Sequence, residues 1–324
     1  MANYKDIHGT TVRNSAGNLS GAATGELFYD STNSDFKYRY PNVSSSWRTG
    51  NSLNTGRHSV NKGGAGTQTA ALAFGGTTPP RTAITESYDG TSWTEVNDLN
   101  TARNDLSGAG ATNTAALAFG GDAPPETDVT ESWNGSNWTE VGDLNTARGY
   151  ASGVGTSTAA LQVAGWYSSA VRAHVEQWDG SSWTEVGDVN TARYVLAAAG
   201  TTSNAVAFGG APVTGKTELW NGSSWTETTD LNTNRSSLSG LGTYTSALAI
   251  SGNPNRAITE KWNGSTWTEV NDLSTGREDG GATGTTTSGL QFGGNPFSAL
   301  TEEWTANVSI GAWATGGSLN TNRQ

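Results

Sequence analysis

Cysteine is absent from this chain of 324 residues, and histidine occurs only three times. The lack of cysteine excludes disulfide bonds and thiolate metal ligands. The three histidines, His8, His58 and His174, stand at non-equivalent positions of the repeat described below. We therefore expect neither a metal site nor a cofactor.

Positive charge and long apolar runs are also scarce. The chain has 18 Lys and Arg against 29 Asp and Glu, which gives a net charge of −11. Nonspecific binding of nucleic acid needs clustered basic residues, and none are present. There is no apolar run of about 18 residues that could form a transmembrane helix. The first residues, MANYKDIHGTTVR, lack the apolar core of a signal peptide. We expect no nucleic-acid partner and no membrane insertion.

One phrase, by contrast, is abundant: a Trp, a short polar stretch, and then a variant of Leu-Asn-Thr-x-Arg. Its seven copies are spaced 42 to 46 residues apart and begin at Trp47, Trp93, Trp138, Trp183, Trp225, Trp267 and Trp313. A fixed period of this size indicates a repeat architecture. With 43 Gly, 13 Trp and 9 Tyr, the composition favours short strands, tight turns and an aromatic core.

Each repeat divides into four β-like pieces. Between Arg103 and Trp138 they are a small Gly-rich piece, AALAF, TDVTESW and a piece that starts at Trp138. Asn134-Gly135, between the last two pieces, favours a tight hairpin with positive φ. A four-stranded unit of this length is typical of a propeller blade, because one twisted sheet cannot bury both of its faces alone.

The sequence therefore predicts an all-β protein with a single β-propeller over residues 13–324. We expect seven blades of four antiparallel strands, over residues 13–50, 57–96, 103–141, 148–186, 193–228, 235–270 and 277–316. Residues 13–50 are the most degenerate copy, so six blades plus an N-terminal appendage is the alternative. Residues 1–12 are expected to form a flexible arm. The ring would close by packing of the first blade on the last, with residues 319–323 laid over the seam.

Glutamates recur in register with the repeat. One series lies two positions before the first aromatic of each Trp pair, and we expect it to pair with the repeated Arg, with a ring-shaped ion site as the alternative. A residue that recurs in every blade is more typical of a scaffold than of catalysis. We therefore expect no catalytic residues.

Variation is confined to the connections between the second and third pieces. Because strand direction alternates within a blade, these loops share one face of the ring with the connections between blades, and binding residues are expected in such variable loops. The candidates there are Trp166 and Tyr167, with Arg81, Arg172, Arg256 and Phe297 as weaker ones. Local packing of Trp166 and Tyr167 against Val171 or a neighbouring blade is the alternative.

The order of Arg, an apolar strand with Gly-Gly, an aromatic and a Trp about five residues later resembles the kelch repeat. The resemblance implies a kelch-like β-propeller. The first aromatic of the pair is usually Trp here, as at Trp133, and Tyr88 is the more kelch-like choice.

The units WNGSSWTE, DLNTAR and TAALAFGG are similar to those of repeat proteins of tailed phages, marine ones especially. That resemblance implies a non-enzymatic virion structural protein in the fibre, the tail or a capsid decoration. Its partners would be other virion proteins and a host receptor or surface glycan, and assembly could make it oligomeric. A cytoplasmic kelch-type adaptor for protein–protein interaction is the alternative.

An enzyme is the third hypothesis. Kelch propellers include galactose oxidase, but the copper site implied by that resemblance contains a Cys-modified Tyr, and this chain has no Cys. Sialidase propellers carry Asp-box turns, which SYDGTSW at 87–93 resembles only superficially, because its Asp directly precedes Gly. A hairpin turn accounts for that segment better.

Overall fold

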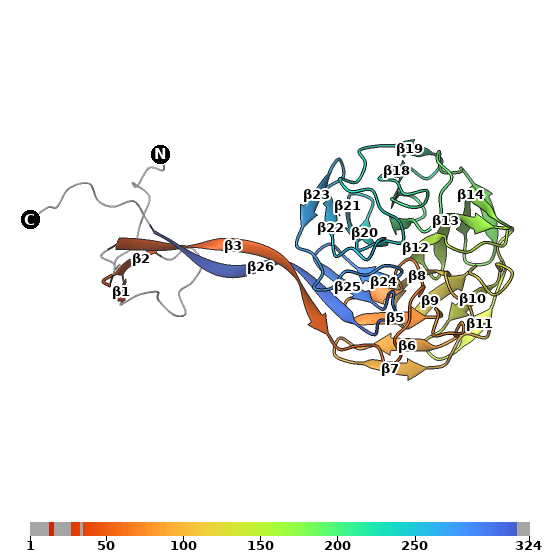
Figure 1. Ribbon diagram of the computed structural model, residues 1–324, viewed down its shortest axis with the longest axis horizontal. Coiled ribbons are helices and arrows are strands. Elements are labelled where there is room, and N and C mark those ends of the chain that lie inside the picture. Colours follow the sequence, from red (N-terminus) through yellow and green to blue (C-terminus); the bar gives the residue numbers. More distant parts are fainter. Residues whose placement is uncertain (1–12, 16–26, 33–34, 316–324) are drawn as a thin grey trace, which may run out of the picture. The chain divides into compact units, whose positions relative to one another are not determined.

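The computed structural model describes residues 13–15, 27–32 and 35–315, and every regular element in these ranges is a β-strand. Residues Ser46–Thr305 form a compact unit. In that unit six sheets surround a central axis (Figure 1), so this part of the chain is a six-bladed β-propeller.

Five blades consist of four consecutive antiparallel strands. Blade 1 holds β4 (Gly66–Thr67), β5 (Ala70–Phe74), β6 (Thr85–Tyr88) and β7 (Trp93–Val96). Blade 2 holds β8 (Ser107–Thr112), β9 (Ala115–Phe119), β10 (Thr130–Trp133) and β11 (Trp138–Glu140). Blade 3 holds β12 (Ser152–Thr156), β13 (Ala159–Tyr167), β14 (Ala170–Trp178) and β15 (Trp183–Val186). Blade 4 holds β16 (Ala197–Gly200), β17 (Ala205–Phe208), β18 (Thr217–Trp220) and β19 (Trp225–Glu227). Blade 5 holds β20 (Ser239–Thr243), β21 (Ser246–Ile250), β22 (Thr259–Trp262) and β23 (Trp267–Val270).

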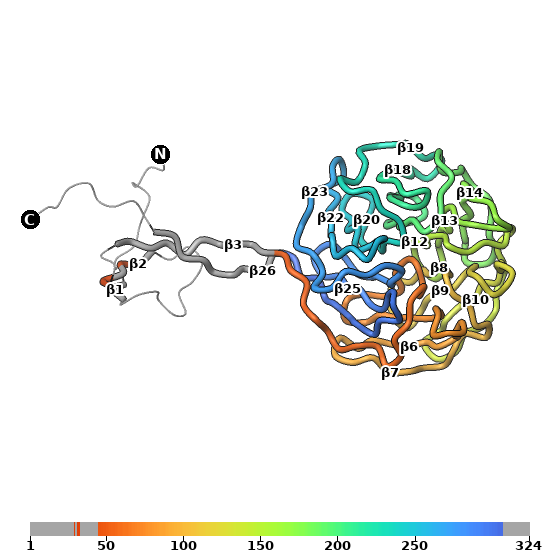
Figure 2. The backbone as a smooth tube through the Cα atoms, viewed as in Figure 1, coloured from red at the N-terminus to blue at the C-terminus, as the bar shows by residue number. Residues whose placement is uncertain are grey.

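The sixth blade joins the two ends of the ring. Its sheet runs from β24 (Gly281–Gly284) through β25 (Ser288–Phe292) and β26 (Thr301–Thr315) to β3 (Asp35–Gly50), which precedes blade 1 in the chain. Figure 2 lets the reader follow the chain around the ring by colour, from orange at blade 1 to blue at β25. The outer strand of the last blade is therefore supplied from the N-terminal side.

The prediction of seven blades is thus wrong, and its six-bladed alternative is confirmed. The ring of Trp47 lies 5.3 Å from that of Trp304, a spacing equal to that of Trp133 and Trp138 in blade 2. The Nε1 of Trp47 donates a hydrogen bond of 3.1 Å to Thr259 Oγ1 in blade 5. Trp47 is the outer Trp of blade 6, so its copy of the phrase completes the ring instead of ending a separate blade.

The described residues of the range 13–50 form three strands in place of a four-stranded blade. The strand β1 (Arg13–Ser15) pairs in parallel with β2 (Leu27–Asp30), and β2 pairs antiparallel with the start of β3. These strands and the last part of β26 belong to a second compact unit, Met1–Ser45 with Ala306–Gln324. The phrase at Trp313 begins in this second unit, outside the propeller. Residues 1–12 and 319–323, for which an arm and a seam cover were predicted, lie outside the described residues.

Aromatic residues fill the space between neighbouring blades. Trp138 of blade 2 packs at 5.0 Å from Phe74 of blade 1, and its Nε1 donates a 3.1 Å hydrogen bond to Thr85 Oγ1 of blade 1. Equivalent Trp–Thr bonds join all the blades except blades 3 and 4. There the Thr position is occupied by Val175, and Trp225 donates instead to the Gly187 carbonyl at 3.0 Å. The repeated Trp is therefore a scaffold residue that connects adjacent blades.

Buried ion pairs lie beneath the loops of all six blades. They pair the Arg of the repeated phrase with the Glu two positions before the inner aromatic, as predicted: Arg57–Glu86, Arg103–Glu131, Arg148–Glu176, Arg193–Glu218, Arg235–Glu260 and Arg277–Glu302. The Asn of the phrase adds further bonds. In blade 3, the backbone N–H and the Nδ2 of Asn145 donate to Glu176 Oε2 at 2.7 and 2.8 Å. The phrase that leaves one blade thus satisfies the buried carboxylate of the next.

Candidate functional site

One face of the propeller carries both the loops between the second and third strands and the connections between blades. The backbone N–H of Leu99, in the connection after blade 1, donates to the carbonyl of Ala83 in the blade 1 loop at 3.1 Å. The same bond recurs between Leu144 and Asp128 in blade 2 at 3.0 Å. The prediction that these two sets share a face is confirmed, and we call it the loop face.

A closed ring of backbone hydrogen bonds encircles the axis at the loop face. The residue two positions after each repeated Arg donates its N–H to the carbonyl of its counterpart in the preceding blade, at 2.7 to 3.0 Å. These residues are Ser59, Asp105, Tyr150, Val195, Ser237 and Asp279, and all have positive φ. Non-glycine residues rarely adopt such φ values. The ring fixes the direction of six side chains around the axis.

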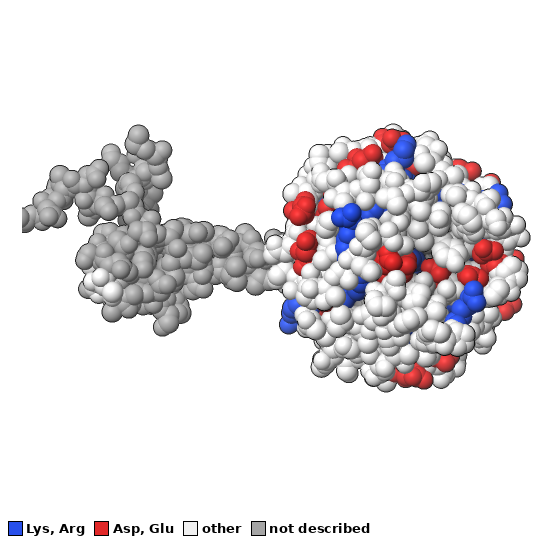
Figure 3. All heavy atoms as spheres, in the orientation of Figure 1, with Lys and Arg blue, Asp and Glu red and all other residues white. Residues whose placement is uncertain are grey.

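Charged groups gather within this ring. Lys62 Nζ donates to Asp279 Oδ1 at 2.8 Å, and Asn104 Nδ2 donates to Asp105 Oδ2 at 3.0 Å. Acidic atoms are visible near the centre of the face in Figure 3. Burial raises the pKa of Asp105 to about 7, and the negative charge of Asp279 adds to this effect while Lys62 opposes it. Asp105 therefore binds a proton more readily than an exposed Asp does.

The raised pKa of Asp105 makes stability depend on pH. An unfolded Asp has a pKa near 3.9, so the folded state holds this proton more tightly than the unfolded state does. The stabilisation is fully present below about pH 4 and is lost as the pH rises through about 7. We expect wild-type protein to lose on the order of 2 kcal/mol between pH 5 and pH 8 through this group. The Asp105→Asn variant should lose less, as urea unfolding at both pH values would show; equal losses would contradict the assignment.

Three of the predicted binding residues lie on one hairpin of blade 3. Its strands β13 and β14 are nine residues long and end in a tight turn at Ser168 and Ser169. The equivalent strands of blade 2 have five and four residues. Trp166 pairs with Val171 across the hairpin, and the Arg172 guanidinium lies 5.8 Å from the centre of the Tyr167 ring. Trp166, Tyr167 and Arg172 are each half-buried.

The other three predicted residues lie in separate blades. Arg81, in the blade 1 loop, donates to Asp122 Oδ2 at 2.7 Å and to Asn104 Oδ1 at 2.9 Å. Asp122 lies in the loop of blade 2, and Asn104 lies in the connection that leads to blade 2. Arg256 lies in the loop of blade 5. Phe297, in the loop of blade 6, is 45% exposed and packs at 4.9 Å against His58. The structure therefore does not gather the six candidates into one site.

Two residues that the sequence analysis missed complete the aromatic surface at blade 3. Tyr194, in the connection to blade 4, packs with its ring 4.9 Å from Trp166. Tyr150, on the axial ring, lies 6.4 Å from Tyr194 with the rings perpendicular. We call Tyr150, Trp166 and Tyr194 the aromatic cluster. Other repeats have no Trp or Tyr at the positions of Tyr150 and Tyr194, and this difference is the sequence signal that could have identified them.

The aromatic cluster continues into a polar network. The Tyr150 hydroxyl donates to Asp122 Oδ2 at 3.4 Å, and that carboxylate also accepts from Arg81. Burial and the nearby charges of Asp105 and Asp122 raise the pKa of Tyr150, so its hydroxyl stays protonated and can donate. The cluster thus offers ring faces, hydroxyl groups and a carboxylate side by side.

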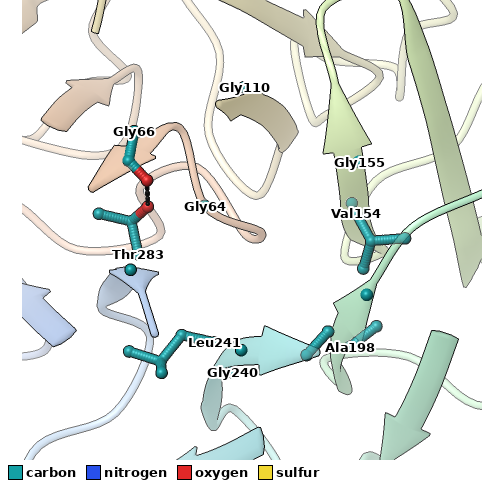
Figure 4. A pocket seen from close by; sticks show the side chains of 14 residues that line it. Gly64, Gly66, Gly110, Val154, Gly155, Ala198, Gly240, Leu241 and Thr283 are labelled. Atoms are coloured by element: carbon teal, nitrogen blue, oxygen red, sulfur yellow. Dashed lines mark hydrogen bonds between the residues drawn. The ribbon is translucent and has the colours of Figure 1, made fainter. Parts of the chain in front are cut away.

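The axial channel itself offers little chemistry. It has a volume of about 130 Å³ and is lined by the innermost strands of the six blades, mostly by Gly and Ala (Figure 4). A Cβ on Gly153 would lie 2.3 Å from the carbonyl oxygen of Gly108, so larger residues cannot stand there. In the wall of this channel, Thr283 Oγ1 of blade 6 donates to the Gly66 carbonyl of blade 1 at 2.5 Å. No titratable side chain is among the lining residues.

Within the described ranges, no group of three or more His, Asp or Glu is arranged to hold a metal ion. The same part of the chain has no helix long and apolar enough to span a membrane. Comparisons with known protein families and with curated proteins find no match to this chain.

Proposed function

We propose that the chain is a non-enzymatic structural protein of a phage virion, and that it binds a partner through its loop face. The virion part of the proposal rests on the similarity of units such as WNGSSWTE and DLNTAR to repeat proteins of tailed phages, and the observation that carries the binding part is the aromatic cluster. It departs from an otherwise regular repeat at positions that the loop face exposes. Aromatic residues at a surface of this kind supply contact area together with polar tips, as binding sites require.

The repeated residues support a scaffold function. The glutamate two positions before each inner aromatic forms a buried ion pair with an Arg, so its carboxylate is occupied within the fold. The repeated Trp fills space between blades. Because the repeated Glu and Trp have these structural roles, we expect binding at the loop face instead. The fibre, the tail or a capsid decoration are all compatible with such a protein.

Mass spectrometry of purified virions of the phage that encodes the chain would test this proposal. We expect the chain at a fixed copy number relative to the major capsid protein, and no hydrolase or oxidase turnover by the purified protein. Absence of the chain from the particles would contradict the proposal and favour a cytoplasmic kelch-type adaptor. Turnover of a substrate would contradict its non-enzymatic part.

A further inference from the structure

The residues of the aromatic cluster differ from their counterparts in the other repeats. Two of them lie in the connections that enter and leave blade 3, and the third lies on the hairpin of blade 3. Tyr150 takes a position that other blades fill with Ser59, Asp105, Val195, Ser237 and Asp279. Trp166 directly follows the paired small residues of its repeat, a position held elsewhere by Thr77, Asp122, Ala211, Asn253 and Asn295. Neither position holds Trp or Tyr in any other repeat. The same is true of the position of Tyr194, directly after the repeated Arg.

The fold brings these separate departures into contact. Tyr150 and Tyr194 are 44 positions apart in the chain, but their rings lie 6.4 Å apart, and Trp166 lies 4.9 Å from Tyr194. Each of these residues is half-buried, which means that it is supported by the propeller and still reachable from solvent. The result is a row of three rings that runs from the axial ring to Trp166 on the blade 3 hairpin.

Polar groups border the row of rings at its axial end. At the axial end, Asp122 accepts from Tyr150 and from Arg81, so its negative charge is balanced. This border thus contains a hydroxyl, a carboxylate and a guanidinium group beside the aromatic rings, and the carboxylate is paired with Arg81.

This combination fits a sugar better than a peptide. A pyranose ring has apolar C–H faces, which pack on aromatic rings, and hydroxyl groups at its edge, which bond to carboxylates and guanidinium groups. Protein hot spots also contain Trp, Tyr and Arg, but they lie within an interface that buries about 800 Å² per partner around an apolar core. Among the described residues, the exposed large hydrophobic side chains are Val213 and Phe297, and neither belongs to the cluster.

Building on the proposed function, we propose that the aromatic cluster binds pyranose rings of an uncharged glycan. Trp166 and Tyr194 would form the platform on which a sugar ring stacks. Asp122 would accept hydrogen bonds from sugar hydroxyls, and the Tyr150 hydroxyl would position Asp122.

Native affinity electrophoresis of the full chain would test this inference. The gels would contain a soluble glucan, a mannan or a galactan as neutral probes, and alginate as an acidic one. We expect at least one neutral polysaccharide to retard the wild-type protein. The Trp166→Ala and Tyr194→Ala variants should bind that polysaccharide about tenfold more weakly, since each loses a stacking ring worth about 1.4 kcal/mol.

The matched control is Tyr244→Ala, which removes a half-buried Tyr from a turn between the first two strands of blade 5, on the opposite face. This variant should bind like the wild type. Thermal unfolding of each variant would confirm folding. Tyr194→Ala alone decides the test if Trp166→Ala does not fold.

Three outcomes would overturn the inference: no neutral polysaccharide retards the wild type, only alginate does, or the Trp166 and Tyr194 variants bind unchanged. These failures are separate from failure of the proposed function. A chain found in virions that binds no glycan would overturn this inference alone. A chain that binds a neutral glycan but is absent from virions would overturn the virion assignment alone.

Discussion

Replacing Arg148 by alanine is expected to lower the free energy of unfolding by about 3–5 kcal/mol. The Arg148 guanidinium is fully buried and bonds to Glu176 Oε1 at 2.5 Å and to the Ala164 and Thr146 carbonyls at 3.1 and 3.2 Å. Its removal would leave the Glu176 carboxylate buried without its counter-charge. Breaking a buried pair from one side is costly because the remaining charge cannot recover its hydration.

Lys216→Ala is the matched control for this experiment. Lys216 pairs with Glu227 at 2.9 Å, but their side chains are 35% and 49% exposed. A pair so open to solvent should contribute no more than about 1 kcal/mol. Urea unfolding of both variants would make the comparison. A loss at Arg148 no larger than that at Lys216 would contradict the view that these pairs hold the blades together.

Replacing Trp47 by alanine is expected to destabilise the propeller by about 2–4 kcal/mol, as the loss of a large packed side chain does. Trp47 is the outer Trp of blade 6, and it contacts Trp304 and bonds to Thr259 of blade 5. The next residue, Arg48, pairs with Glu303 in β26. Because this strand closes the ring, the variant should also raise the rate at which the propeller opens at the seam.

Trp313→Ala is the control, since Trp313 begins another copy of the same phrase but lies in the second compact unit. Because Trp313 belongs to the other compact unit, its substitution should leave propeller unfolding within about 0.5 kcal/mol of the wild type. Denaturant unfolding followed by the fluorescence of the propeller tryptophans would measure both variants. Equal losses at the two positions would contradict ring closure by β3.

The repeat predicted the propeller because its period and its turn signals are local properties of the sequence. The Asp89-Gly90 turn illustrates this: the Asp89 carboxylate accepts from the Thr91 and Ser92 N–H groups, and Gly90 takes a φ of 91°. The pairing of Arg with Glu could also be predicted, because both recur in register and both need a partner once buried. These interactions depend on the repeat alone.

Blade number could not be predicted in the same way. The phrases at Trp47 and Trp313 are similar in sequence, and only strand pairing decides which one completes the last sheet. That pairing joins residues about 250 positions apart, and no local pattern encodes it. The contacts within the aromatic cluster could not be predicted either, and for the same reason. Trp166 was recognisable as unusual, but its contact with Tyr194 depends on how the connection leaving blade 3 lies beside its loop.

An electron cryomicroscopy map of the virions would test the central claim most directly, namely that a six-bladed propeller is held on the particle with its loop face available for binding. The account predicts density for six blades, with the Trp47 strand as the outer strand of blade 6 and no virion protein covering Trp166 and Tyr194. A map with no propeller density, or with the aromatic cluster buried against another virion protein, would contradict it.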